Sequence, residues 1–180
     1  MSISKILLIV VMFAGPFGYA DIEKTAVPTD EGLKLFWWPK VNPPKGFEFN
    51  EEASRHFGAK MFVQSGSTFS NSESVIYAKA LFKPRIPETK SLQAMIDNDI
   101  SECKSNYPDL KVVQEPSLID GNGKKIKVFS FTSSAKGSWE AVAYSEEGEY
   151  FLIFTVSSQS NKGHEASFVV FKSMLQGYRE

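Results

Sequence analysis

Ser101 and Lys104 form a pair whose spacing could support catalysis. A serine followed three positions later by a lysine, on a helix, is how penicillin-binding enzymes arrange their nucleophile. Those enzymes also require a Ser-Asp-Asn and a Lys-Thr-Gly motif, and the sequence contains neither. Ser101 and Lys104 are therefore predicted to lie on the exposed face of a helix.

Two further motifs match the beginning of a metal site but not its remainder. His164-Glu165 starts like the helix motif of zinc proteases, but Phe168 stands where the second histidine is needed. Residues 120–124 start like a calcium loop, but Lys124 occupies a ligand position and no acidic residue closes the loop. We predict that His164 lies in the first turn of a helix and that 120–124 forms a hairpin turn.

The rest of the sequence offers no catalytic constellation. Two histidines leave little room for a histidine metal cluster or a serine triad. A phosphate-binding loop is missing, because Leu118 stands where its first glycine is required. We therefore expect no catalytic residues, no metal site and no cofactor. The alternative is a cofactor-free hydrolase whose site is assembled from scattered residues.

Aromatic and cationic residues indicate a recognition surface instead. Trp37 and Trp38 are adjacent, so on a strand their side chains point to opposite sides, one into the core and one outward. Arg55 and His56 lie nearby in sequence, and Arg85 lies in a loop bracketed by prolines; such groups on loops are frequent in binding sites. The candidate binding residues are Trp38, Arg55, His56 and Arg85. The alternative is that both arginines are merely solvated and both tryptophans fill the end of the core.

These residues must be positioned by a sheet whose centre is the stretch 125–158. Short polar breaks that carry a glycine separate three predicted strands, 125–132, 139–145 and 150–156. In the last strand Phe154 points to one side and Phe151 to the other, so both faces of the sheet require cover. The predicted fold class is α/β, a mainly antiparallel sheet covered by helices on both faces as an α-β-α sandwich.

The remaining elements follow from periodicity and from turn residues. Further strands are predicted at 35–38, 59–64, 75–82 and 112–119. Asn50 is the expected cap of a short helix over 51–57, and Ser91 the cap of a helix that ends near Asn106. A final helix is predicted from about 162 to 178, where apolar residues recur every three or four positions.

Cys103 is the only cysteine, which excludes an intramolecular disulfide framework. It shares the apolar stripe of the helix before Asn106 with Ile96 and Ile100. A buried, unreactive thiol is therefore predicted. The alternative is a thiol that reacts or that pairs between chains.

The first twenty residues are typical of a secretory signal peptide, residues 1–20. Lys5 precedes an apolar run, and Gly18-Tyr19-Ala20 supplies the small residues that a signal peptidase reads, so cleavage is expected before Asp21. The alternative, an uncleaved anchor, is disfavoured because a spanning helix needs about 20 apolar residues and Pro16 interrupts this run. We expect an exported protein, periplasmic or secreted, that is soluble after cleavage.

The balance of basic and acidic residues indicates which classes of partner to expect. The 20 basic and 21 acidic residues leave no excess of positive charge that would favour nucleic acid or an anionic membrane. The expected partner is an envelope protein or a small ligand, with no nucleic acid and no stable membrane insertion after cleavage.

Residues 21–34 are polar and show no hydrophobic period, which predicts an N-terminal arm. Residues 35–180 are predicted to form a single domain.

A resemblance to a known family rests on the order of these elements. Residues 44–49, Pro-Lys-Gly-Phe-Glu-Phe, precede a short helix and the 59–64 strand, and the chain ends on a helix with Phe171-Lys172-Ser173-Met174-Leu175-Gln176-Gly177-Tyr178-Arg179. This order resembles the PsbP-like fold, a group that includes the extrinsic photosystem II subunit, a Ran-binding nuclear import factor and small exported bacterial proteins of the DcrB type. The chain lacks the photosynthetic docking arm. The resemblance implies a non-enzymatic accessory or binding domain.

Overall fold

The computed structural model describes residues 22–29, 32–135 and 137–179. The predicted signal peptide and its cleavage point lie outside these residues. The strands are β1 (Ile22–Thr29), β2 (Gly32–Pro39), β3 (Phe47–Phe49), β4 (Lys60–Gln64), β5 (Ser74–Phe82), β6 (Lys111–Gln114), β7 (Leu118–Ile119), β8 (Lys125–Ser133), β9 (Ser138–Glu147) and β10 (Tyr150–Ser158). The helices are α1 (Glu51–Phe57), α2 (Leu92–Asn106) and α3 (Asn161–Gln176), with a 3₁₀ turn at Lys83–Arg85.

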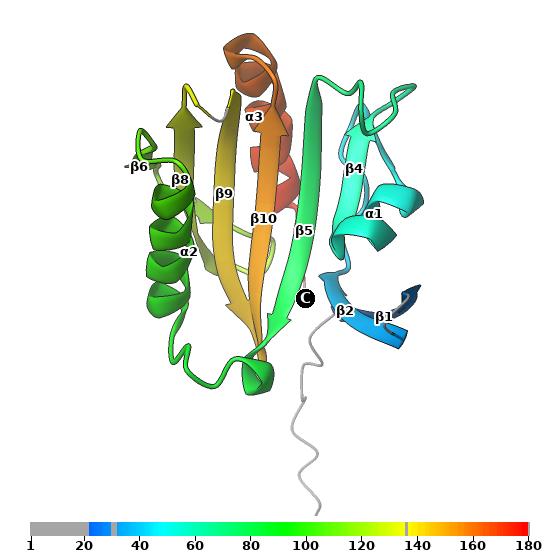
Figure 1. Ribbon diagram of the computed structural model, residues 1–180, viewed down its shortest axis with the longest axis vertical. Coiled ribbons are helices and arrows are strands. Elements are labelled where there is room, and N and C mark those ends of the chain that lie inside the picture. The colour runs from blue at the N-terminus through cyan, green and yellow to red at the C-terminus, as the bar shows by residue number, and fades with distance from the viewer. Residues whose placement is uncertain (1–21, 30–31, 136, 180) are drawn as a thin grey trace, which may run out of the picture.

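These strands form a ten-stranded sheet in which every described pairing is antiparallel, which confirms the mainly antiparallel sheet. Its main path runs in the order β1-β2-β5-β10-β9-β8-β6 (Figure 1). β4 pairs with β5 and carries β3 on its other side, and β7 pairs with β8. The predicted three-strand meander is the run of β8, β9 and β10 at the centre of this order.

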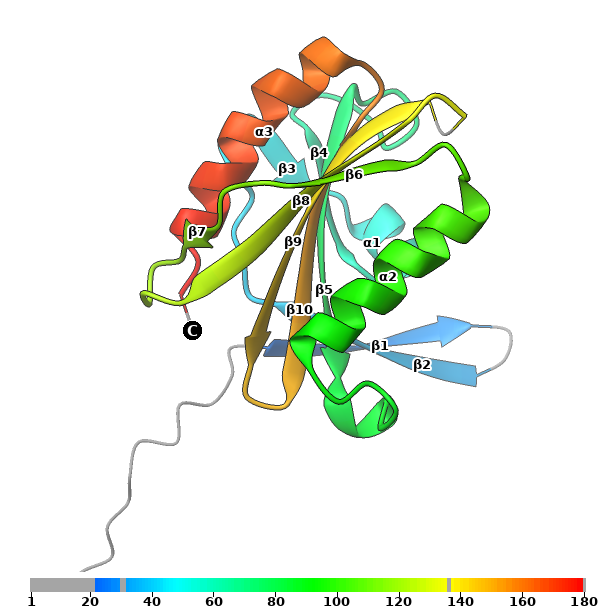
Figure 2. The ribbon, with the colours of Figure 1, turned by 90° about the vertical axis from the view of Figure 1, so that its left-hand side faces the viewer.

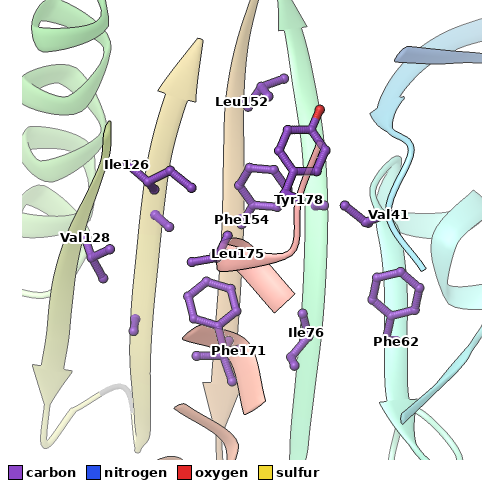
Figure 3. Packing of buried hydrophobic residues seen from close by; sticks show 14 of the residues in the cluster. Val41, Phe62, Ile76, Ile126, Val128, Leu152, Phe154, Phe171, Leu175 and Tyr178 are labelled. Carbon is purple, nitrogen blue, oxygen red and sulfur yellow. The ribbon is translucent and has the colours of Figure 1, made fainter. Parts of the chain in front are cut away.

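One face of the sheet packs against α3. Phe171 and Leu175 of the helix are fully buried with Leu152 and Phe154 of β10 (Figure 3). Tyr178, just beyond the helix, closes this cluster through an edge contact with Phe154, with 5.3 Å between ring centroids. The residues that face α3 are thus the even-numbered positions of β10, as strand alternation requires.

A second apolar cluster contains the odd-numbered positions of β10. Phe151 and Ile153 pack there with Met95 and Ile96 of α2 and with Tyr144 of β9. Figure 2 shows α2 and α3 on opposite sides of the sheet. Phe151 and Phe154 are therefore both buried, although they point in opposite directions.

The predicted helix starts are confirmed at α1 and α2. The side chain of Asn50 accepts a hydrogen bond from the Ala53 N–H at 2.9 Å, and that of Ser91 accepts one from the Ala94 N–H at 3.1 Å. Each cap satisfies an N–H group that the first helical turn leaves without an intrahelical acceptor. None of the helices among the described residues combines the length and the apolarity needed to cross a membrane.

Three local features differ from the sequence-based expectation. The segment expected to be an arm contains β1, which pairs with β2 along its whole length. The single strand expected at 112–119 is two strands, β6 and β7, because Pro116 between them cannot donate to a ladder. Cys103 lies on the predicted apolar stripe of α2 but is half-buried, because that helix rests on the sheet mainly through its first half.

Candidate functional site

α1 positions two of the four candidate residues, Arg55 and His56. The helix is short because Gly58 adopts a left-handed conformation, with φ of 64°, directly after Phe57. Gly58 also lies against the ring of Phe36 in β2, where an added Cβ would come within 2.3 Å of a ring carbon. Glycine at this position therefore ends the helix and allows β2 to approach it.

A hollow of about 320 Å³ lies between α1 and the β1–β2 hairpin. Its lining residues are Glu23, Thr25, Trp38, Phe49, Glu51, Arg55 and Lys60. Trp38 is only 5% exposed, and its Nε1 has no hydrogen-bond partner among the described residues. Trp38 thus lines the hollow with a side chain that is otherwise buried. The partly buried Trp37 stacks on Phe82.

Charges around this hollow are paired. Arg55 binds Glu51 one helical turn earlier at 2.7 Å, and both side chains are exposed. Lys60 of β4 binds Glu23 of β1 at 3.1 Å, which joins these two strands of the sheet. An exposed ion pair contributes about 0 to 1 kcal/mol. Arg55 can therefore exchange Glu51 for another carboxylate at small cost.

The C-terminal end of α1 carries an exposed aromatic group that the sequence analysis did not identify. Phe57 is 53% exposed, and its ring lies 4.9 Å from that of Phe69, in the serine-rich loop between β4 and β5. The His56 ring meets Phe57 edge-on at 4.7 Å. The apolar character of Phe57 was visible in the sequence, but its contact with a loop residue was not.

Arg85 does not join this group. Its guanidinium lies over the Trp37 ring, 4.5 Å from the centroid, in a separate hollow of about 210 Å³. That hollow is on the Trp37 side of β2, whereas Arg55 lies on the Trp38 side. The structure thus brings Trp38 and Arg55 together at one hollow, places His56 against Phe57 at the end of α1, and leaves Arg85 apart.

The discounted motifs have local structural roles. Ser101 and Lys104 are exposed on α2, as predicted. The Asp120 carboxylate accepts hydrogen bonds from the N–H groups of Asn122 and Lys124, at 2.8 and 2.9 Å, and so closes the hairpin turn. His164 lies in the first turn of α3, stacked on Phe168, and burial lowers the pKa of its imidazole. Within the described residues, no group of three or more His, Cys, Asp or Glu could hold a metal ion.

No family model and no curated protein matches this sequence. Among solved structures, the chain is similar to a Pseudomonas aeruginosa protein of unknown function, with a TM-score of 0.53 and 11% identity, over 87% of this chain and 96% of that one. This similarity shows a shared fold and nothing about function.

Two further structures match less well. The cyanobacterial PsbP of Synechocystis has a TM-score of 0.44 and 13% identity, covering 89% of this chain and 92% of that one. The Ran-binding protein Mog1p of Saccharomyces cerevisiae has a TM-score of 0.42 and 13% identity, covering 84% of each chain. These TM-scores do not by themselves establish a common fold.

Proposed function

We propose that the chain is an exported, non-enzymatic accessory or binding protein with a PsbP-like α-β-α sandwich, and that it recognises an envelope protein. The contact is assigned to the α1 surface, defined as Phe49, Arg55, His56, Phe57 and Phe69. The observation that carries the proposal is the exposed ring pair of Phe57 and Phe69 beside a cationic helix end.

Exposed phenylalanines are the first support. Phe57 is 53% and Phe49 is 42% exposed, although the sheet and its helices bury most of the other aromatic side chains. Large apolar groups that remain in water around one short helix favour burial against a partner. Aromatic residues with an arginine nearby are also the usual composition of the energetically dominant part of an interface.

The second observation that supports the proposal is that Arg55 can exchange its ion-pair partner. Arg55 and Glu51 are both exposed, so their ion pair contributes little to the stability of the free protein. A carboxylate on a partner could take the place of Glu51 and form a bidentate pair with the guanidinium group. Trp38 supplies a fixed wall behind Arg55, whereas Arg85 would form a separate contact area with Trp37.

The test is a binding experiment with matched surface variants. The double variant Phe57→Ser and Phe69→Ser is compared with Val113→Ser, because Val113 is 58% exposed on β6 at the far edge of the sheet. We expect the double variant to bind the envelope protein that co-purifies with the wild type at least about tenfold more weakly. We expect Val113→Ser to bind like the wild type and all proteins to unfold at similar denaturant concentrations.

Two results would overturn the proposal. Equal loss of binding in the double variant and in Val113→Ser would show that the α1 surface has no special role. Turnover of an esterase, peptidase or glycosidase substrate, abolished by one substitution, would favour the hydrolase alternative.

Export is tested separately by mass spectrometry of the natively expressed protein, for which we expect Asp21 as the first residue of the mature chain. An intact Met1 form in membranes would contradict export with cleavage.

A further inference from the structure

A third hollow, on the opposite side of the molecule from α2, lies between α3 and the extended segment 40–45 that joins β2 to β3. Its volume is about 600 Å³. The helix contributes Val169, Val170, Ser173 and Met174, and Tyr178 and Arg179 follow at its end. Val169 is 63% exposed on this helix. We call this hollow the α3 groove.

The described residues that line the α3 groove carry charges of one sign. Lys40, Lys45 and Arg179 are among them, and none of these described lining residues is acidic. The whole chain carries a net charge of −1, so this cationic rim is a local feature rather than a general excess. A concave site with cations of one sign attracts an anionic group and raises its local concentration.

Arg179 is positioned by hydrogen bonds of the preceding residue, Tyr178, through its side chain and its backbone. The Tyr178 hydroxyl donates a hydrogen bond to the buried carboxylate of Glu147 at 2.6 Å. The Tyr178 carbonyl accepts one from the Gly121 N–H at 2.8 Å. An added Cβ at Gly121 would come within 2.7 Å of Arg179 Cγ. Tyr178 and Arg179 thus lie against the β7–β8 turn, and Arg179 also lines the α3 groove.

The shape of the α3 groove favours an aliphatic chain over a peptide. Pro43 and Pro44 lack N–H groups, so the 40–45 segment cannot pair continuously with an added strand. Opposite them, Val170 and Met174 present aliphatic side chains, and methionine adapts readily to flexible apolar ligands. A volume of about 600 Å³ is within the range of sites for small organic ligands.

We propose that the α3 groove binds a free long-chain carboxylate, a fatty acid in monomeric form. The aliphatic chain lies along Val170 and Met174, and the carboxylate lies between Lys45 and Arg179. This site is independent of the α1 surface, so the proposed protein partner and the proposed ligand stand or fall separately.

Fluorescence titration with a dansyl-labelled undecanoic acid tests the proposal, with displacement by unlabelled palmitic acid. We expect the double variant Lys45→Ala and Arg179→Ala to bind at least about tenfold more weakly than the wild type. Lys104→Ala removes a lysine that is also exposed, on α2, and should bind like the wild type. Lys45→Glu alone, at an exposed position of a turn, should also weaken binding and keeps the test valid if the double variant does not fold.

Three outcomes would contradict the proposal. Binding of the probe that is unchanged in the double variant would place the ligand elsewhere. Displacement by a long-chain alcohol as effective as displacement by palmitic acid would show that the cations do not hold a carboxylate. Association with phosphatidylglycerol vesicles in the absence of binding to the free acid would identify a membrane surface as the ligand instead.

Discussion

The two longest helices are attached to the sheet in different ways. In α3, Phe171 and Leu175 are fully buried, and hydrogen bonds hold both ends of the segment: Ser160 donates to Glu73 at 2.5 Å, and Tyr178 donates to Glu147. In α2, only Met95 and Ile96 are buried among its residues.

The second half of α2 rests on the sheet through half-buried side chains. Ile100 and Cys103 continue its apolar stripe, and the Tyr144 hydroxyl donates a hydrogen bond to Asp99 in the middle of the helix. Because less apolar surface is removed from water at this end, less free energy opposes its local opening. The comparison indicates that α3 is a fixed part of the sheet and that α2 is the element more readily released.

The largest expected effect tests whether the sheet is buried on both sides at its centre. Phe154→Ala opens a cavity beneath α3 and Phe151→Ala opens one beneath α2, and each should lower the free energy of unfolding by roughly 3 to 5 kcal/mol. Denaturant unfolding of the two variants measures the losses. A severe effect of one substitution and a nearly silent effect of the other would show that one face of β10 is open to water.

Removal of one tyrosine hydroxyl beside each helix compares how strongly α3 and α2 are attached to the sheet. Tyr178→Phe takes a donor away from Glu147, which is 2% exposed, and should cost about 1 to 3 kcal/mol because the buried carboxylate loses a hydrogen bond. Tyr144→Phe removes the bond to the half-exposed Asp99, which water can replace, and should cost about 0.5 to 1.5 kcal/mol. Thermal and denaturant unfolding measure both costs. A larger loss for Tyr144→Phe would reverse the ranking of the two helices.

The centre of this fold could be predicted from sequence, because its signals are local. Strand alternation in β10 identified residues for both faces, and Asn50 and Ser91 marked helix starts through bonds to residues three positions later. β1 was missed because it carries Glu23 and Lys24 and has no apolar period. Its strand conformation depends on pairing with β2, and Glu23 is tied to Lys60, 37 positions away in sequence.

The candidate site could be predicted only in part for the same reason. Arg55 and His56 share a helix, so their proximity was certain from sequence. Whether Arg85 joins them depends on which side of β2 each tryptophan occupies, and period-two alternation leaves that choice open. The contact of Phe57 with Phe69 depends on how the serine-rich loop folds back over α1, and no repeating pattern in that loop encodes it.

Alkaline pH should lower the stability of the folded protein through two tyrosines. Burial is the largest cause that raises the pKa of both Tyr77 and Tyr144, and the negative charge of Asp99 raises the pKa of Tyr144 further. Unfolded tyrosine loses its proton near pH 10, whereas these native tyrosines keep theirs, so the native state binds more protons above that pH. The stability that these two tyrosines contribute is therefore fully present below about pH 10. Above that pH the free energy of unfolding falls by up to about 1.4 kcal/mol per pH unit for each tyrosine.

Comparison with Tyr144→Phe isolates this contribution. The two proteins differ only in the Tyr144 hydroxyl, so the difference between their stability curves reports the ionisation of that hydroxyl, including its coupling to Tyr77. Between about pH 10 and 12 the variant should lose stability less steeply than the wild type, by about 1.4 kcal/mol per pH unit. Urea unfolding at a series of pH values measures both slopes. Parallel curves would mean that the Tyr144 hydroxyl ionises as readily in the folded protein as in the unfolded one.

The smallest effect is a difference in thiol reactivity between the two helices. Cys103 on α2 should react slowly with a thiol reagent in the native protein and rapidly after unfolding, because its side chain packs against the sheet. For comparison, Ser167→Cys in a Cys103→Ser background places a thiol at a buried position of α3. Its labelling requires release of Phe171 and Leu175, so it should be at least about tenfold slower than that of Cys103, a difference of about 1.4 kcal/mol in opening free energy.

The dependence of labelling on low concentrations of urea separates local from global opening. Release of α2 alone exposes little surface, so the labelling rate of Cys103 should rise only slightly with urea. The thiol at position 167 should show a steep dependence, close to that of global unfolding, because α3 separates from the sheet only when the core beneath it is lost. Equal rates and equal slopes at the two positions would mean that both helices open only with the whole sheet. In that case the shallow burial of Cys103 would not reflect a weaker attachment of α2.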